Sequence, residues 1–187
     1  MVFMIEKKVS VPDNVEIEIS GKNAVIRGTK GDITRDFDDP RFNKSVEIKK
    51  EGRTVIVMSA SDNRKIKAFV GTIAAHIDNM IKGVTVGYKY TMKIHHVHFP
   101  MSLAVKDNTV QIKNFLGEKG TRTAKISGRA EINIDKDDIM ITGINLEDVG
   151  QTAANIERAV KLSKNDRRIF IDGIYLSGKF LQNGEKI

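Results

Sequence analysis

Residues 149–159 read VGQTAANIERA and contain the pattern that decides the fold. Apolar side chains recur along this stretch and just beyond it, at Val149, Ala153, Ile156 and Val160. Steps of four, three and four residues are typical of a helix that packs one face against a sheet. We expect this helix to begin near Gly150, where small residues would let its N-terminus approach an anionic partner closely.

A second stripe runs along the same helix and is polar. Gln151, Asn155 and Arg158 are also four and three residues apart, and they lie about 200° around the helix from the apolar stripe. Amide groups can donate and accept hydrogen bonds to ribose hydroxyls and base edges, and Arg158 extends the face toward phosphate. A helix with alanines that only allow tight sheet packing is the simpler interpretation, but it leaves the amides unexplained. The stripe therefore predicts an RNA-facing surface.

This helix ends a plan that the chain contains twice. The first copy runs from VPDNVEIEISGKNAVIRGTKG (11–31) through SVEIKKEGRTVIVMSAS (45–61) to a helical segment at 63–84. The second copy runs from FPMSLAVKDNTVQIKNFLGEKG (99–120) through RAEINIDKDDIMITGI (129–144) to the helix that contains residues 149–159. The repeat predicts two tandem duplicated α+β domains, 1–83 and 84–187.

Strand and turn signals fill in each copy. Apolar and polar residues alternate in VEIEIS (15–20) and AEINID (130–135), as in half-buried strands. KKEGRT (49–54) and DKDD (135–138) have the composition of hairpin turns. In the first helix, Asp62-Asn63 is the expected N-cap, and the buried stripe is expected at Ile66, Val70, Ile73, Ile77 and Ile81. Each domain is thus expected to be an antiparallel-rich sheet with one helix on a face.

Composition limits the chemistry. The chain has 187 residues and no cysteine, which excludes disulfides, thiolate metal ligands and cysteine nucleophiles. The start, MVFMIEKKVS, lacks the apolar core of a secretory signal, and no apolar run reaches the roughly 18 residues of a membrane span. We expect a cytoplasmic protein without a membrane partner.

Positive charge gathers in the second copy. The formal net charge is +7 and the isoelectric point is about 9.5, which favours an anionic partner such as nucleic acid. Together with the helix, the basic stretches give these candidate RNA-binding residues: Lys119, Arg122, Lys125, Gly150, Gln151, Asn155, Arg158, Lys161, Lys164, Arg167 and Arg168.

The first basic stretch, FLGEKGTRTAKISGR (115–129), has features of a phosphate-binding loop. Gly117 and Gly120 would let the backbone turn and approach a surface. The cations and the hydroxyls of Thr121 and Thr123 match the usual partners of phosphate and sugar oxygens. A solvated basic hairpin remains the alternative for this segment.

Two other motifs invite a chemical interpretation. On a strand, His96 and His98 of IHHVHF (94–99) would share a face and His95 would point away. A zinc site needs a third or fourth ligand, and none stands at an obvious spacing, so we predict no metal. RGTKG (27–31) lacks the spacing of a phosphate-binding loop and is expected to be a hairpin turn. We predict no catalytic residue, cofactor or small-molecule substrate.

The second helix and the sequence after it resemble a known family. GINLEDVGQTAANIERA (143–159) and DRRIFIDGIYLSGK (166–179) look like the C-terminal signature of the large-subunit ribosomal protein L-six family. NRKIKAFVGTIAAHIDNMIKGVTVGYKY (63–90) and FPMSL (99–103) resemble its archaeal and eukaryotic branch. The resemblance spans nearly the whole chain.

The resemblance implies a ribonucleoprotein component that serves translation. Such a protein is a structural constituent of the large ribosomal subunit, with no enzymatic activity. Its C-terminal domain binds 23S-type ribosomal RNA near the translation-factor-binding region, beside neighbouring ribosomal proteins. The resemblance also adds Lys179, in the tail of the chain, to the candidate RNA-binding residues. Two other functions stay open at this stage: a metal-dependent hydrolase or nuclease built on the histidines, and a free regulatory RNA-binding protein.

Overall fold

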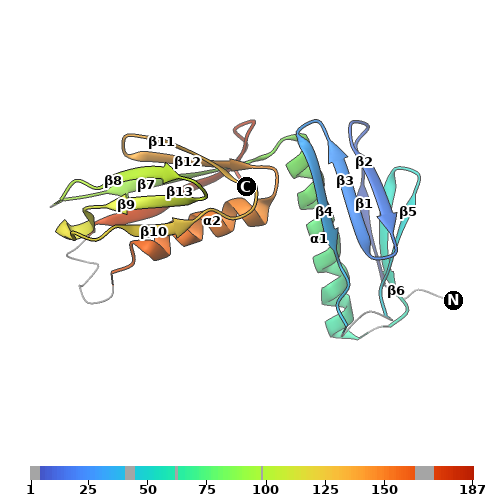
Figure 1. Ribbon diagram of the computed structural model, residues 1–187. Coiled ribbons are helices and arrows are strands. Elements are labelled where there is room, and N and C mark those ends of the chain that lie inside the picture. Colours follow the sequence, from blue (N-terminus) through green and yellow to red (C-terminus); the bar gives the residue numbers. More distant parts are fainter. Residues whose placement is uncertain (1–4, 41–44, 62, 98, 163–170) are drawn as a thin grey trace. The chain divides into compact units, whose positions relative to one another are not determined.

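The computed structural model describes residues 5–40, 45–61, 63–97, 99–162 and 171–187 (Figure 1). The chain divides into two compact units, Met1–Val86 and Gly87–Ile187. Helix α1 (Arg64–Thr85) belongs to the first unit and continues past residue 83, where the sequence analysis places the domain boundary. Its C-cap is Val86, so the division follows the end of the helix.

The first unit consists of two three-stranded antiparallel sheets and α1. One sheet has the order β2-β3-β4 and the other β1-β6-β5. The strands are β1 (Ile5–Ser10), β2 (Glu16–Ser20), β3 (Asn23–Gly28), β4 (Gly31–Asp36), β5 (Glu47–Glu51) and β6 (Thr54–Ser59). Helix α1 contacts strands of both sheets, chiefly β1, β3 and β6, and so covers the joint apolar face.

The second unit repeats this arrangement with one extra strand. Its sheets have the orders β10-β9-β8 and β11-β12-β7-β13, again antiparallel. The elements are β7 (Tyr88–His95), β8 (Ser102–Lys106), β9 (Thr109–Lys113), the 3-10 turn η1 (Phe115–Gly117), β10 (Arg122–Lys125), β11 (Glu131–Asp135), β12 (Asp138–Gly143), α2 (Leu146–Ala159) and β13 (Gly173–Leu181). The predicted fold class, two duplicated α+β units, is confirmed, and each unit divides its strands between two sheets.

The two copies correspond residue by residue along their helices. Val70-Gly71 of α1 matches Val149-Gly150 of α2, and both helices continue with a pair of alanines and an isoleucine at the same spacing. The sheet β1-β6-β5 likewise matches β7-β12-β11. The difference between the copies is β13, which pairs with the second edge of β7 and appears in red beside it in Figure 1.

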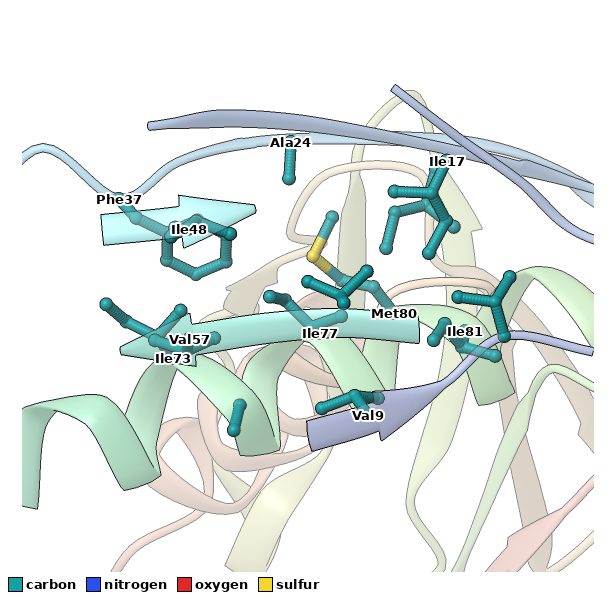
Figure 2. Close-up of a cluster of buried hydrophobic side chains, with 14 of the residues drawn as sticks. Val9, Ile17, Ala24, Phe37, Ile48, Val57, Ile73, Ile77, Met80 and Ile81 are labelled. Atoms are coloured by element: carbon teal, nitrogen blue, oxygen red, sulfur yellow. The ribbon is translucent and has the colours of Figure 1, made fainter. Parts of the chain in front are cut away.

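Both predicted helix stripes form cores. Every member of the α1 stripe is buried, and Figure 2 shows Ile73, Ile77 and Ile81 gathered with Val9 and Val57 of the sheet. All four apolar positions of the α2 stripe are buried as well. At the N-terminus of α1, the side chain of Asn63 accepts a hydrogen bond from Lys65 N at 3.0 Å, as expected for the N-cap. The helical periodicity of the sequence therefore predicted both cores correctly.

The three predicted turns are also hairpins. Turns 49–54 and 135–138 join β5 to β6 and β11 to β12, and RGTKG joins β3 to β4. The last of these docks on the end of α1, because Lys30 N donates to Val84 O at 3.0 Å. A Cβ atom on Gly28 would lie only 2.6 Å from Val84 Cγ2, so a glycine is needed for this approach.

Candidate nucleic-acid interface

The predicted RNA-binding residues of the second unit come from three elements. Helix α2 carries Gly150, Gln151, Asn155 and Arg158, with Lys161 just beyond its end, and β10 begins and ends at Arg122 and Lys125. Lys119 lies in the loop before β10, and Lys179 lies on β13. Lys164, Arg167 and Arg168 lie outside the described residues. Helix α2 contacts β10, β12, β7 and β13, so the structure brings together the elements that carry these residues.

Helix α2 begins earlier than the sequence analysis predicts. Its first residue is Leu146, and the side chain of Asn145 caps it by accepting a hydrogen bond from Glu147 N at 3.1 Å. Gly150 is consequently the fifth residue of the helix, and its backbone N–H lies beyond the four N-terminal N–H groups that are free to bind an anion. The first turn also contains Glu147 and Asp148, and these carboxylates complement the positive end of the helix dipole. The prediction that the helix begins near Gly150 is wrong, whereas contact of Gly150 with RNA stays a prediction.

The amide stripe of α2 is partly committed to the fold. Gln151 Nε2 donates to Asn155 Oδ1 at 2.8 Å, and Asn155 Nδ2 donates to the main-chain oxygen of Lys125 at 2.8 Å. Asn155 is half-buried and Gln151 is exposed. Asn155 therefore joins α2 to β10, while Gln151 offers the accessible amide of the pair. Contact of either side chain with RNA remains a prediction.

Arg122 is held by partners within the unit. Its Nε and Nη2 atoms donate to the two carboxylate oxygens of Glu118 at 2.8 and 2.6 Å. Nη1 donates to Ala159 O at 2.8 Å, at the end of α2, and the guanidinium stacks 4.4 Å from the ring centroid of Phe115. The hydrogen bond from Arg122 holds the pKa of Glu118 below its usual value. Arg122 thus connects the loop at Glu118 to the end of α2, and the carboxylate of Glu118 offsets the charge of the guanidinium.

The loop between η1 and β10 presents other cations to solvent. Lys119 and Lys125 are exposed, as are the hydroxyl-bearing Thr121 and Thr123. Gly117 has a positive φ of 75°, as predicted for a turn. Gly120 is exposed, but its φ is not positive.

Exposed cations flank α2 on both sides. Lys125 lies on the β10 side, whereas Lys179 on β13 lies with its Nζ 5.4 Å from the ring centroid of Tyr90. A Cβ atom on Gly150 would lie 3.9 Å from Cε2 of that ring, so Lys179 stands beside the opposite flank of the helix. Gln151 and Arg158 occupy the face between the flanks, and both are exposed. We name Lys125, Gln151, Arg158, Lys161 and Lys179 the α2 surface.

Two further residues position this surface and were not predicted from the sequence. Thr152 is fully buried, and its Oγ1 accepts a hydrogen bond from Ser127 N at 2.9 Å. Glu157 Oε1 accepts from Leu176 N of β13 at 3.1 Å. The placement of Thr152 one residue before the stripe residue Ala153 could have indicated a buried hydroxyl. No sequence signal identifies Leu176 as the partner of Glu157.

The histidines lie at the end of a strand. Strand β7 ends at His95, so His96 lies beyond it and the expected alternation of faces stops there; His98 is outside the described residues. The ring of His95 lies 5.8 Å from that of Tyr175, and His96 Nδ1 lies 4.0 Å from Asp137 Oδ1. The described residues contain no group of three potential ligands that could hold a metal ion.

The fold and surface define a class: a basic protein of two duplicated α+β units, with an amide-and-cation surface on the second helix. No helix in the described part of the chain has the length and apolarity needed to cross a membrane. The sequence model of the family described as Ribosomal protein L6 matches residues 11–87 and 99–173. The chain belongs to this family. Each of the two matched segments lies largely within one unit, which agrees with the internal duplication.

Its relatives include archaeal proteins named large ribosomal subunit protein uL6. The protein from Desulfurococcus amylolyticus is 48% identical over 180 residues, covering 95% of this chain and 96% of its own length. That from Staphylothermus marinus is 47% identical, covering 92% and 93%. That from Methanocella arvoryzae is 44% identical, covering 92% and 96%. The predicted family and its archaeal branch are confirmed.

Proposed function

We propose that this chain is a structural component of the large ribosomal subunit and binds its 23S-type RNA mainly through the second unit. The α2 surface carries the proposal. It combines four exposed cations with an exposed amide, Gln151, on elements that are joined by internal hydrogen bonds. The names of the relatives and the family membership support the ribosomal setting.

The chemistry of the α2 surface suits RNA. Lysine and arginine neutralise phosphate, and an amide can bond to a ribose hydroxyl or a base edge in the wide minor groove of an RNA helix. Because Asn155 and Arg122 already bond within the unit, they are proposed to hold the surface in shape. Lys119 and the basic residues Lys164, Arg167 and Arg168 complete the proposed contact set, which we place near the translation-factor-binding region.

No catalytic role is proposed. The hydrolase alternative depended on His95, His96 and His98, and the two described members of that set are near Tyr175 and Asp137. The distinction from a free regulatory RNA-binding protein rests on where the chain resides. Co-sedimentation with large ribosomal subunits in a gradient separates the two, because a ribosomal constituent stays with the particle through high-salt washing.

Salt dependence tests the RNA contact itself. If the surface neutralises about five phosphates, the logarithm of the association constant with large-subunit RNA should fall by several units per decade of salt. Footprinting should then show protection of one region of that RNA by the isolated second unit, residues 87–187, and little protection by residues 1–86. A flat salt response, or equal protection by both halves, would contradict the proposal.

A further inference from the structure

Strand β1 is an edge strand of its sheet in the described part of the chain. Among the described residues, β6 is the one strand that pairs with it. Val11 N donates to Arg53 O, at the position that continues the β1–β6 register. Since bonded and non-bonded pairs alternate in an antiparallel ladder, the main-chain groups of Glu6, Lys8 and Ser10 point away from β6. They form a row that another strand could bind.

The equivalent edge in the second unit is filled. Strand β7 corresponds to β1, and β13 pairs with it antiparallel from Gly173 to Leu181. The helix assists this pairing, because Glu157 Oε1 accepts a hydrogen bond from Leu176 N of β13. The second unit thus shows how this fold receives a strand between the sheet edge and the helix.

The first unit retains the receiving groove. A groove of about 340 Å³ runs between β1 and α1. Its lining includes Lys7, Lys8 and Ser10 from the strand and Gly71 and Asp78 from the helix. Asp78 occupies the helix position of Glu157, and Gly71 occupies that of Gly150. A Cβ atom on Gly71 would meet nothing within 4 Å, so the space beside the helix is open.

Charge distinguishes this groove from its filled counterpart. Lys7 pairs with Val57, whereas Tyr90 pairs with Ile141, the counterpart of Val57 in the second copy. Lys7 therefore stands where the second unit has Tyr90, opposite Lys179 of β13. A lysine on an edge strand discourages unspecific pairing, and opposite charges across a strand pair are favourable. An incoming strand should accordingly carry a carboxylate opposite Lys7.

We propose that the β1 edge binds an extended segment of another protein by antiparallel strand addition, with an acidic residue opposite Lys7 and a main-chain N–H on Asp78. The site uses the first unit alone, so it is independent of the proposed RNA contact. Neighbours of this protein in its assembly would supply such a segment.

The filled edge supplies the probe for a test. Two synthetic peptides have the β13 sequence, GIYLSGKFL, with either the original lysine or a glutamate at the position of Lys179. The full-length chain should bind the glutamate peptide at least about fivefold more tightly, because one peptide attracts Lys7 and the other repels it. Hydrogen exchange measured by NMR should slow at the Lys8 and Ser10 amides. In Lys7→Glu, the preference between the peptides should reverse.

Filling the groove provides a second variant. Gly71→Leu should reduce peptide binding while leaving the melting temperature at or above that of the parent, since its side chain enters open space. Thr72→Leu, which adds the same side chain on the neighbouring exposed position, should bind the peptide as the parent does. Absence of binding at millimolar peptide, protection elsewhere than β1, or a preference that ignores Lys7 would overturn the proposal. So would β1 protection that grows with protein concentration without peptide, since the occupant would then be a second copy.

Discussion

Asn155 on α2 donates its side-chain amide to the main-chain oxygen of Lys125 on β10, 2.8 Å away. One hydrogen bond thus joins the helix to the strand that carries an exposed cation of the proposed interface. The same asparagine accepts from Gln151, so the exposed amide is oriented by the half-buried one. The order of the α2 surface depends on this chain of two bonds.

The first prediction concerns the stability that Asn155 provides. Asn155→Leu should lower the free energy of unfolding by about 0.5–1.5 kcal/mol, the net contribution of a typical hydrogen bond, because the bond to Lys125 O is lost. Gln151→Leu, on the exposed neighbour, should stay within about 0.5 kcal/mol. Thermal or urea unfolding of both variants measures the difference. Equal stabilities would show that the bond to Lys125 contributes nothing net.

The second prediction concerns affinity for large-subunit RNA. Arg158→Ala and Lys125→Ala should each weaken binding with little change in melting temperature, since both side chains are exposed. Each loss of one phosphate contact should also reduce the salt slope by about one unit. Lys65→Ala, an exposed cation on α1, is the matched control and should alter neither quantity. Unchanged slopes in the first two variants would remove these residues from the interface.

A third prediction compares the same substitution at two glycines of the first unit. Gly28→Ala should destabilise by about 1–3 kcal/mol, because the new methyl group meets Val84, including its main-chain oxygen. Gly71→Ala should instead stabilise by about 0.5–1 kcal/mol, since a glycine inside a helix costs that much relative to alanine and the site is open. Denaturant midpoints should therefore move in opposite directions.

The fourth prediction is a pH dependence. The pKa of Glu118 is lowered, first by its hydrogen bond from Arg122. A lowered pKa in the folded state contributes stability above the usual value of 4.5, and this contribution is lost as pH falls through the lowered pKa. Glu118→Gln should hence be less stable than the parent at pH 7, by no more than about 1 kcal/mol for so exposed a pair.

The stability difference between Glu118→Gln and the parent should vanish under strong acid. Melting temperatures from pH 7 down to about pH 3 follow the loss. Glu131→Gln, on the exposed strand β11, controls for the removal of a carboxylate elsewhere. A difference that persists undiminished at low pH would mean that the glutamine variant disturbs packing and not the ion pair.

The periodicity of the sequence predicted the features that depend on a single helix or strand. Ile77 and Ile156 fall on apolar stripes, and each stripe requires a sheet beneath it, so helices, cores and duplication follow from the sequence. The start of α2 was not predicted, although asparagine is a favoured N-cap residue and Asn145 is followed by an acidic residue three positions later. The small residues around Gly150 led to an expected helix start that is four residues too late in the sequence.

Side-chain partners could not be predicted, because they depend on the meeting of distant segments. Arg122 resembles any solvated cation in the sequence, and its bond to Ala159 exists only once β10 lies beside α2. Strand β13 likewise pairs with β7, although residues 96–172 separate the two strands in the sequence. The sequence therefore indicated elements that do come together in the structure. The division of their side chains into exposed ones and ones bonded within the unit required the structure, and their contact with RNA stays a prediction.

The long reach of β13 has a consequence for synthesis of the protein. In the first unit Ile5 pairs with Ser59, so that sheet can close while the rest of the chain is still being made. In the second unit β12 pairs with one edge of β7, but His95 on the other edge pairs with Gly173, so that edge must wait for a segment translated much later. Non-local pairing of this kind is slow, and unpaired edges in a growing chain invite aggregation. We expect the first unit to fold on the nascent chain, leaving β7 as the stretch that most needs a chaperone until β13 emerges.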